Sequence, residues 1–357
     1  MLYKTRNPHG GDVYSKKIRL DFSSNSNPFG TPESVKEAIK AAAENARNYP
    51  DPYCRELVGE LASHEGVPED SILCGNGAAE LIYSVCAAVN GSAAVETAPT
   101  FSEYSEALGA NGFEVRRYAL DSNKDFEVDR GILDFIGING PDIVFVCNPG
   151  NPTGMAIDAD LLADMASLCQ KNGSLLVVDE CFLDLSDGLK SMVGLTSDNR
   201  NVLVLKDFSK SYALAGVRLG YCISSNHELL GAMSKTVQLW NVSSLAQAAG
   251  TASLRERDYL EKTRKFIAGE REWMKAELEK IGFRVCRSDA SYLLMHGAPG
   301  LAEALESEGI AIRDCSNYHG LSAGWYRTAV RLHDENVELI SALRGAAGYI
   351  GGGRING

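Results

Sequence analysis

The sequence has no long apolar run, since none of its apolar stretches approaches the roughly 20 residues that a membrane-spanning helix requires. Its first residues, MLYKTRNPHGG, lack the apolar core of a secretory signal. The nine cysteines include no CxxC pair, which argues against a zinc site or a disulfide framework and indicates reduced, mostly buried thiols. These absences predict a cytoplasmic protein with no membrane partner and no bound metal.

Basic side chains are also scarce. The chain has 35 Lys and Arg against 47 Asp and Glu, a net charge of −12, which argues against a nucleic-acid or anionic-membrane partner. Small anions can still bind where arginines, helix N-termini and backbone amides gather. The composition, 45% hydrophobic and 23% charged over 357 residues, is that of a globular protein with a substantial core and two domains or subdomains.

Short apolar runs alternate with helical stretches between residues 72 and 224. This alternation predicts an α/β fold in which a mostly parallel sheet lies between helices. Later apolar runs predict a smaller sheet near the C-terminus. We therefore expect a large domain over residues 46–245 and a smaller α/β domain built from residues 1–45 and 246–357. The runs in the first part are SILC, SAAVE, DIVFVC, SLLVVD, NVLVL and LGYCIS, and those in the second are FRVC, YLLMH, IAIRD and RTAVRL.

Ligands of such folds bind beyond the carboxyl ends of the strands, and polar residues follow several of these runs. The glycine turn at Gly77 and Ala78 joins a strand to a helix, so its amides could receive a phosphate. The rigid turn NPGNPTG at 148–154 can aim the amide of Asn151 at a ligand. Asp179 ends an apolar strand, where a carboxylate requires a cation; capping of the next helix is an equally good interpretation.

The stretch LKDFSKSYALAGVRLGY, residues 205–221, holds the most informative lysine. Lys210 follows Ser209 and precedes Arg218 by eight residues. This pattern suits a lysine that forms an imine with an aldehyde cofactor beside a phosphate-anchoring arginine, as in a pyridoxal phosphate (PLP) site. A solvated surface lysine is the simpler alternative, but the apolar segment 213–216 leaves little polar surface around it.

The ordered set GNGAAE, PTFSEY, NPGNPTG, VDECF and FSKSYALAGVRLGY resembles the fold-type I PLP enzymes of the aminotransferase class I/II superfamily over nearly the whole chain. Within it, the chain most resembles the L-threonine-O-3-phosphate decarboxylases of cobalamin synthesis, which are related to histidinol-phosphate aminotransferases. This second resemblance is carried by HGGDVY, DFSSNSNPFG, DECFLDL, SDASYLL and IRDCSNYHGLSAGWYRTAVRLHDEN. It implies decarboxylation of a phospho-amino acid to an aminoalkyl phosphate and CO2. The alternative is an aminotransferase of the histidinol-phosphate type that uses 2-oxoglutarate and glutamate.

The resemblance also implies roles for the cofactor-binding residues. Lys210 would bind PLP covalently and move protons at the substrate Cα, while Asp179 would keep the pyridine nitrogen protonated. Asn151 would donate to the phenolic oxygen. Phe101 is the first choice for the aromatic that stacks on the ring, and Tyr104 is the second. The phosphate would be bound by Gly77, Ala78, Ser209, Arg218 and Tyr49.

Two further expectations concern assembly and substrate. Tyr49 would reach the phosphate from a second subunit, which implies a homodimer with shared active sites. Arg327 matches the family's arginine for the substrate carboxylate. The candidates for contacts elsewhere on the substrate, above all its phosphate, are His9, Asn27, Arg313 and Arg331. For Arg313 and Arg331 the alternative is pairing with acidic neighbours such as Asp314 or Asp334.

Two positions depart from the pattern of the superfamily. Many aminotransferases have a tyrosine three residues after the pyridine-binding aspartate, but this chain has Phe182, which has no donor; this favours the decarboxylase interpretation. Relatives often carry Ser or Thr three residues before the lysine, where this chain has Asp207. Because a carboxylate would repel a phosphate, we expect Asp207 to turn away or to be neutralised, and to lie outside the site.

Overall fold

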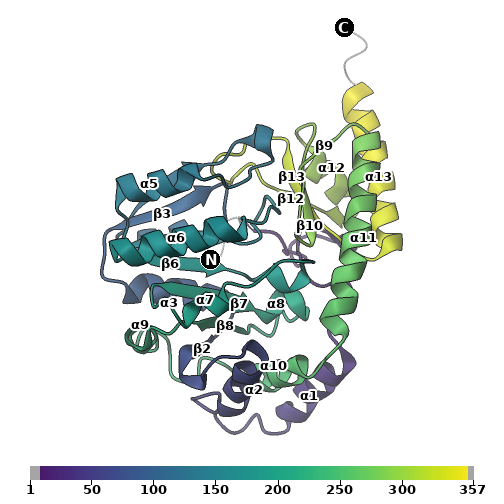
Figure 1. The fold of residues 1–357 in the computed structure, drawn as a ribbon. Coiled ribbons are helices and arrows are strands. Elements are labelled where there is room, and N and C mark those ends of the chain that lie inside the picture. Colours follow the sequence, from purple (N-terminus) through teal and green to yellow (C-terminus); the bar gives the residue numbers. More distant parts are fainter. Residues whose placement is uncertain (1–8, 353–357) are drawn as a thin grey trace.

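The structure is a computed structural model of the chain and describes residues 9–352; its largest element is a seven-stranded sheet (Figure 1). β8 runs antiparallel to its two neighbours, and the other neighbouring strands are parallel. The mostly parallel α/β fold expected from the sequence is therefore confirmed. In sheet order the strands are β2 (Ile72–Gly75), β8 (Gly220–Ile223), β7 (Val202–Asp207), β6 (Leu175–Asp179), β5 (Ile143–Cys147), β3 (Ala93–Ala98) and β4 (Glu114–Ala119).

The central strands are apolar along their whole length because helices cover both faces of the sheet. In β5, Val144 and Val146 belong to one hydrophobic core, and Ile143 and Phe145 belong to the other. The first core contains residues of α2 (Arg55–Glu65), α5 (Gly131–Asn139), α6 (Ala159–Asn172) and α7 (Val193–Thr196). The second contains residues of α3 (Ala78–Ala88), α4 (Glu103–Ala110) and α9 (His227–Met233).

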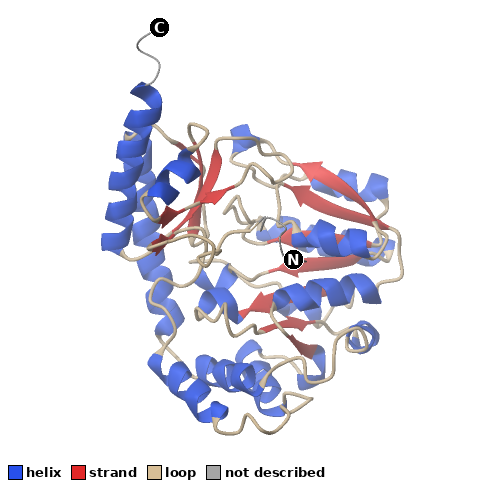
Figure 2. Cartoon of the chain, turned by 180° about the vertical axis from the view of Figure 1, so that it is seen from behind, coloured by secondary structure: helices blue, strands red, loops and turns tan. Residues whose placement is uncertain are grey.

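The C-terminal part forms a smaller unit with its own core (Figure 2). Its antiparallel sheet has the order β12-β13-β10-β9, and β1 of the N-terminal arm pairs with β11 in a separate two-stranded sheet. Two long helices lie side by side against the small sheet (Figure 1). The elements are β1 (Leu20–Asp21), β9 (Arg284–Val285), β10 (Tyr292–His296), β11 (Ile310–Ala311), β12 (Arg313–Asp314), β13 (Trp325–Ala329), α11 (Tyr259–Lys280), α12 (Leu301–Ser307) and α13 (His333–Gly352).

The remaining helices bear on the expected domain boundaries. α1 (Glu33–Ala43) packs mainly on α10 (Ser244–Leu254), and α10 also contacts α2. Val35 and Ala249 belong to the same core as the large sheet. Residues 33–43 therefore pack with the large unit, although the predicted division assigns them to the small domain. The short helix α8 (Phe208–Ser211) follows β7 directly. None of the helices in the described range 9–352 is long and apolar enough to cross a membrane.

Candidate active site

A cavity of about 480 Å³ opens beyond the carboxyl ends of β5, β6 and β7, where it meets the N-terminal arm and the small sheet. The position follows from the topology, because parallel strands bring the residues after their carboxyl ends to one edge of the sheet. The predicted site residues on its wall are His9, Ala78, Phe101, Asn151, Asp179, Ser209, Lys210, Arg218, Arg313 and Arg327. Gly77 borders it, whereas Tyr49, Tyr104, Asn27 and Arg331 are not on the wall of this cavity.

Lys210 lies on α8, immediately after the buried strand β7, and its side chain faces the cavity. Burial lowers the pKa of its amine below the usual range, and the nearby Arg327 and Arg218 act in the same direction, although Asp207 opposes them. A lowered pKa increases the fraction of neutral amine, which is the nucleophilic form. The position therefore suits a lysine that attacks a carbonyl group.

Asp179 is the last residue of β6 and is only 4% exposed. Its Oδ2 accepts from the hydroxyl of Tyr104 at 2.5 Å, and its Oδ1 accepts from the amide of Cys181 at 3.0 Å. Burial raises the pKa of this carboxyl group, and the two hydrogen bonds only partly oppose the shift. No basic side chain forms an ion pair with Asp179 among residues 9–352. A cation in the cavity would stabilise its charged form.

The two aromatic candidates take different places. Phe101 lines the cavity and meets the ring of Tyr104 edge-on, with centroids 5.6 Å apart. Tyr104 is completely buried, stacks on Phe145 and donates to Asp179. Its predicted second-choice role as the stacking ring is therefore corrected: Tyr104 lies behind Asp179 and holds the carboxylate.

An anion-binding cup forms where β2 turns into α3. Gly77 has a φ of 78°, and a Cβ there would lie 2.2 Å from Nη2 of Arg218. Only glycine therefore allows the guanidinium to lie this close to the start of α3. Nη1 of Arg218 also donates to Oγ of Ser209 at 3.3 Å. The guanidinium, the Ser209 hydroxyl and the helix N-terminus, with the amide of Ala78, make the cup suited to a phosphate group.

Asp207 does not turn away from this cup. Its Oδ2 accepts from the amide of Ala78 at 3.1 Å, and its Oδ1 accepts from the amide of Ser209. The residue lines the cavity. The prediction that placed Asp207 outside the site was therefore wrong, because its carboxylate reaches backbone donors of two chain segments far apart in the sequence.

Arg313 and Arg327 are directly paired across β12 and β13, and both line the cavity. Arg327 is 6% exposed and donates to Oδ1 of Asn151 at 2.5 Å and to the carbonyl of Ser23 at 2.7 Å. With its amide oxygen oriented toward Arg327, Asn25 accepts from the guanidinium at 3.2 and 3.3 Å. These contacts fix the Arg327 guanidinium at the cavity wall.

The second arginine and the histidine of the arm each contact neighbouring side chains. Arg313 donates to Oδ1 of Asn317 at 2.8 Å, and its guanidinium lies 5.2 Å from the ring centre of Tyr318. His9 pairs with Glu103 through Nε2 at 2.8 Å. Both residues line the cavity and a second cavity beside it.

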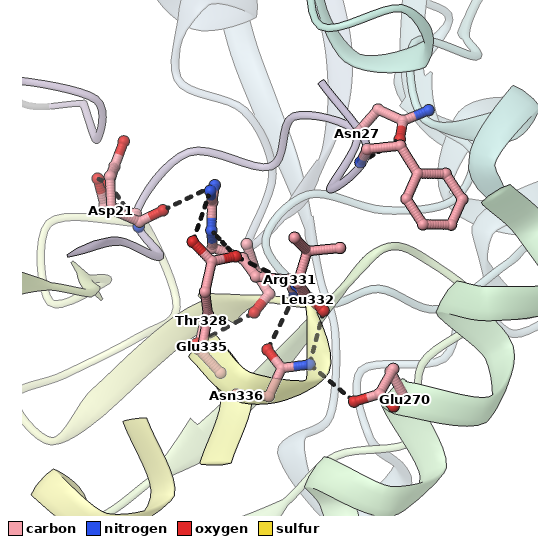
Figure 3. Close-up of polar contacts among 11 residues, drawn as sticks. Asp21, Asn27, Glu270, Thr328, Arg331, Leu332, Glu335 and Asn336 are labelled. Carbon is pink, nitrogen blue, oxygen red and sulfur yellow. Dashed lines mark hydrogen bonds and ion pairs between the residues drawn. The ribbon is translucent and has the colours of Figure 1, made fainter. Parts of the chain in front are cut away.

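Neither Arg331 nor Asn27 lines the main cavity. Figure 3 shows polar contacts that these two residues make. Arg331 forms an ion pair with Glu335 at 3.2 Å and also contacts the carbonyl of Asp21, so the alternative of acidic pairing holds, with Glu335 in place of Asp334. Nδ2 of Asn27 donates to the Ser211 carbonyl at 2.8 Å and to Thr263 at 3.1 Å. Its backbone amide donates to the carbonyl of Lys210 at 3.0 Å, so Asn27 braces the lysine turn. This geometry does not support direct substrate contact by either side chain, and that role stays a prediction.

Sequence reasoning missed several residues of the wall, notably Asn25, Cys181 and Tyr318. Asn25 lies two positions before Asn27 in the same irregular loop, and the sequence gives no periodicity there from which to choose the inward residue. Cys181 follows Asp179 by two positions, a spacing that returns it to the cavity after a strand end. Burial and the nearby carboxylates raise the pKa of its thiol well above the usual range.

The model of the aminotransferase class I and II family matches residues 17–343. A threonine-phosphate decarboxylase of Salmonella typhimurium is 33% identical over 94% of this chain and 95% of its own length. Among solved structures, the histidinol-phosphate aminotransferase of Clostridium acetobutylicum has a TM-score of 0.86 at 28% identity, over 92% of this chain and 99% of its own. The histidinol-phosphate aminotransferase of Sinorhizobium meliloti, solved in complex with pyridoxal 5′-phosphate, has a TM-score of 0.83 at 26% identity, over 92% of this chain and 91% of its own. The chain belongs to the aminotransferase class I and II family.

Proposed function

We propose that this protein is a PLP-dependent decarboxylase that converts L-threonine O-3-phosphate, or a close phospho-amino acid, to an aminoalkyl phosphate and CO2 in cobalamin side-chain synthesis. The observation that carries the proposal is the pairing of Arg313 with Arg327 on the cavity wall that also holds Lys210. Directly paired residues project to the same face with Cβ atoms roughly 5 Å apart. The cavity thus offers two adjacent arginines, and such a substrate carries a phosphate and a carboxylate.

The cavity also fits PLP group by group. The Lys210 amine suits the aldehyde, the buried carboxylate of Asp179 suits a protonated pyridine nitrogen, and the cup at Ala78, Ser209 and Arg218 suits the phosphate. Because Oδ1 of Asn151 accepts from Arg327, its Nδ2 is the donor for the phenolic oxygen. When bound, PLP supplies a conjugated ring that accepts the electron pair of a bond broken at the substrate Cα.

The protein residues then decide which bond at Cα breaks by holding the substrate. Arg313 binds the substrate phosphate, and Arg327 binds its carboxylate, through charge-assisted hydrogen bonds that a planar guanidinium forms well. With the phosphate anchored at Arg313, the carboxylate would be oriented by Arg327, and that orientation would favour loss of CO2. The amine of Lys210 returns a proton to Cα after CO2 has left.

The second candidate is an aminotransferase of the histidinol-phosphate type, because solved aminotransferases of that name share this fold over most of their length. The same arginine pair would accept a phosphorylated amine and a dicarboxylate in turn. Phe182 favours decarboxylation: it lines the cavity, meets Tyr292 edge-on at 5.0 Å and has no hydroxyl to donate to the cofactor. The hydroxyl of Tyr292 donates instead to the carbonyl of Gly150.

The experiment that tests the proposal is direct: PLP-loaded protein is given L-threonine phosphate, and CO2 release is measured against unphosphorylated L-threonine as the matched control. Release from the phosphorylated compound is expected. Equal turnover of both compounds would contradict phosphate anchoring.

We further propose a cytoplasmic homodimer in which each subunit contributes Tyr49 to the other's phosphate cup. Tyr49 is 77% exposed and is not among the described residues that line its own chain's cavity. Its ring stacks on the partly exposed Trp240 at 4.4 Å, so the hydroxyl is presented on a defined aromatic platform at the surface. The division into a large unit at 46–245 and a small one from both ends stays a proposal, with α1 packed on the large unit.

Removing the Tyr49 hydroxyl tests the shared site. In Tyr49→Phe, we expect PLP to dissociate at least about tenfold faster, since a hydrogen bond to a charged group contributes about 1.5–3 kcal/mol. The measurement is the rate at which the cofactor is lost after dilution. The control is Tyr14→Phe, which removes the hydroxyl of a tyrosine that is 95% exposed. Solution scattering of the unchanged protein should give a dimer. A fully active monomer would contradict the shared site.

A further inference from the structure

The carboxylate of Asp207 is built into the anion cup by the sheet itself. In the register of the large sheet, Asp207 of β7 is paired with Gly220 of β8, and Gly220 is paired with Gly75 of β2. A Cβ on Gly220 would lie 2.5 Å from the Ala78 amide nitrogen. Because Gly220 and Gly75 have no side chains, the Asp207 carboxylate can reach past β8 to the Ala78 amide, at 3.1 Å.

The donors that Asp207 uses are those that a phosphate in the cup would use. The Ala78 amide lies at the start of α3, and the Ser209 amide lies in the first turn of α8. Asp207 itself is 8% exposed, so water can replace few of its contacts. A carboxylate and a phosphate must therefore share one cup.

The positive charges around the cup do not balance the negative charges of an ionised Asp207 and a dianionic phosphate. On the cavity side, the cup holds the guanidinium of Arg218, whereas Lys210 would be bonded to the cofactor and Asp179 adds a second carboxyl group. Behind Asp207 lie His64, Tyr221 and Asp184, and the ammonium of Lys206 is already paired with Asp184 at 3.1 Å. Two negative charges in contact repel each other, and the repulsion is stronger where the protein excludes water than in bulk solvent. A dianionic phosphate beside an ionised Asp207 would incur this repulsion twice.

We propose that Asp207 makes the cup bind the cofactor phosphate as a monoanion, with one proton held between the carboxylate and a phosphate oxygen. This inference rests on the proposed PLP site. The second ionisation of a phosphate monoester lies near pH 6, so the free cofactor is mainly a dianion at pH 7–8. Binding then takes one proton from solvent and forms an O–H···O⁻ hydrogen bond, which is among the stronger kinds in proteins.

The consequence is a specific pH dependence of cofactor affinity. The complex holds one proton more than the separated protein and dianion, so raising the pH opposes binding. Between pH 7 and pH 9 the dissociation constant should rise by about tenfold per pH unit more than in a variant without the carboxylate. Lys210 is present in both proteins, so its own contribution to the pH dependence cancels in the comparison.

The matched variant is Asp207→Asn, which has nearly the same shape and keeps an oxygen for the helix amides; Asn is also a favourable N-cap residue. The ³¹P resonance of bound PLP is recorded in both holoenzymes from pH 6.5 to pH 9. In the unchanged protein, we expect the chemical shift of a phosphate monoanion over this whole pH range. In the variant, we expect the chemical shift of a dianion. A second variant, Asp207→Ser, should behave as Asp207→Asn does.

Each outcome decides the proposal. A dianion signal in the unchanged protein, or equal pH dependence of the dissociation constant in all three proteins, would overturn the assignment of Asp207 alone. If the unchanged protein binds no PLP at Lys210, the proposed cofactor site fails as well. Far-UV circular dichroism and melting of each variant establish that the fold is retained.

Discussion

Replacing Lys210 with alanine should abolish turnover and remove the absorbance of the lysine-bound cofactor while the fold remains intact. Lys210 is the lysine that the structure places in the cavity, opposite the buried Asp179 and beside the cup of Arg218. Loss of the group that bonds the cofactor and moves the proton should lower the rate by at least about 10²–10⁴-fold. Removal of a desolvated amine should not destabilise the fold, because burial disfavours its charged form.

The measurement combines the absorbance spectrum with borohydride reduction and mapping of the labelled peptide. The exposed Lys235→Ala is the control and should keep both the spectrum and the activity. If Lys210→Ala kept the absorbance and the label mapped to another lysine, the cofactor site would lie elsewhere.

Replacing Arg313 with alanine should raise KM for L-threonine phosphate by about 30-fold with little change in PLP binding. Loss of a charge-assisted contact corresponds to about 2 kcal/mol. The Arg313 guanidinium lies on the wall of the cavity, next to Arg327 across the strand pair and 5.2 Å from the ring centre of Tyr318. Steady-state kinetics with a parallel PLP titration separate substrate binding from cofactor binding.

Arg331→Ala is the matched control, since Arg331 comes from the same C-terminal region but pairs with Glu335 (Figure 3). Its KM should stay within about twofold of the unchanged value because Arg331 does not line the cavity, and loss of its partly exposed ion pair should cost little stability. An unchanged KM in Arg313→Ala, or a preference of the unchanged protein for unphosphorylated amino acids, would favour an ordinary aminotransferase.

The sequence allowed prediction of the parts that local pattern controls. The strands β5, β6 and β7 are continuous apolar runs, and a buried parallel sheet is the arrangement that such runs favour. Asp179 and Lys210 could be predicted to lie at the carboxyl edge of the sheet, because they stand at or just after the ends of these runs. β4 was missed because it lies at the sheet edge, where its segment EVRRYA carries two arginines and has no apolar run.

The parts that were wrong depend on the directions of side chains and on distant partners. Nothing in the sequence shows that Arg331 faces Glu335, or that the arm directs Asn25, and not Asn27, at Arg327. The position of Asp207 required the gap at Gly220, which exists only once β7, β8 and β2 are aligned. The stacking of Tyr49 on Trp240 was not predicted, because it joins residues far apart in the chain.

The central claim, that the cavity decarboxylates a phospho-amino acid, is tested most directly by following the fate of L-threonine phosphate and of the cofactor in one reaction. Purified, PLP-loaded protein is incubated with the substrate in the absence of any oxo acid, while CO2 and the absorbance spectrum are recorded. The structure, with its paired Arg313 and Arg327 beside Lys210, predicts many equivalents of CO2 per subunit and a cofactor that stays in the pyridoxal form. Conversion of the cofactor to pyridoxamine phosphate, with an oxo acid and no CO2, would contradict the account.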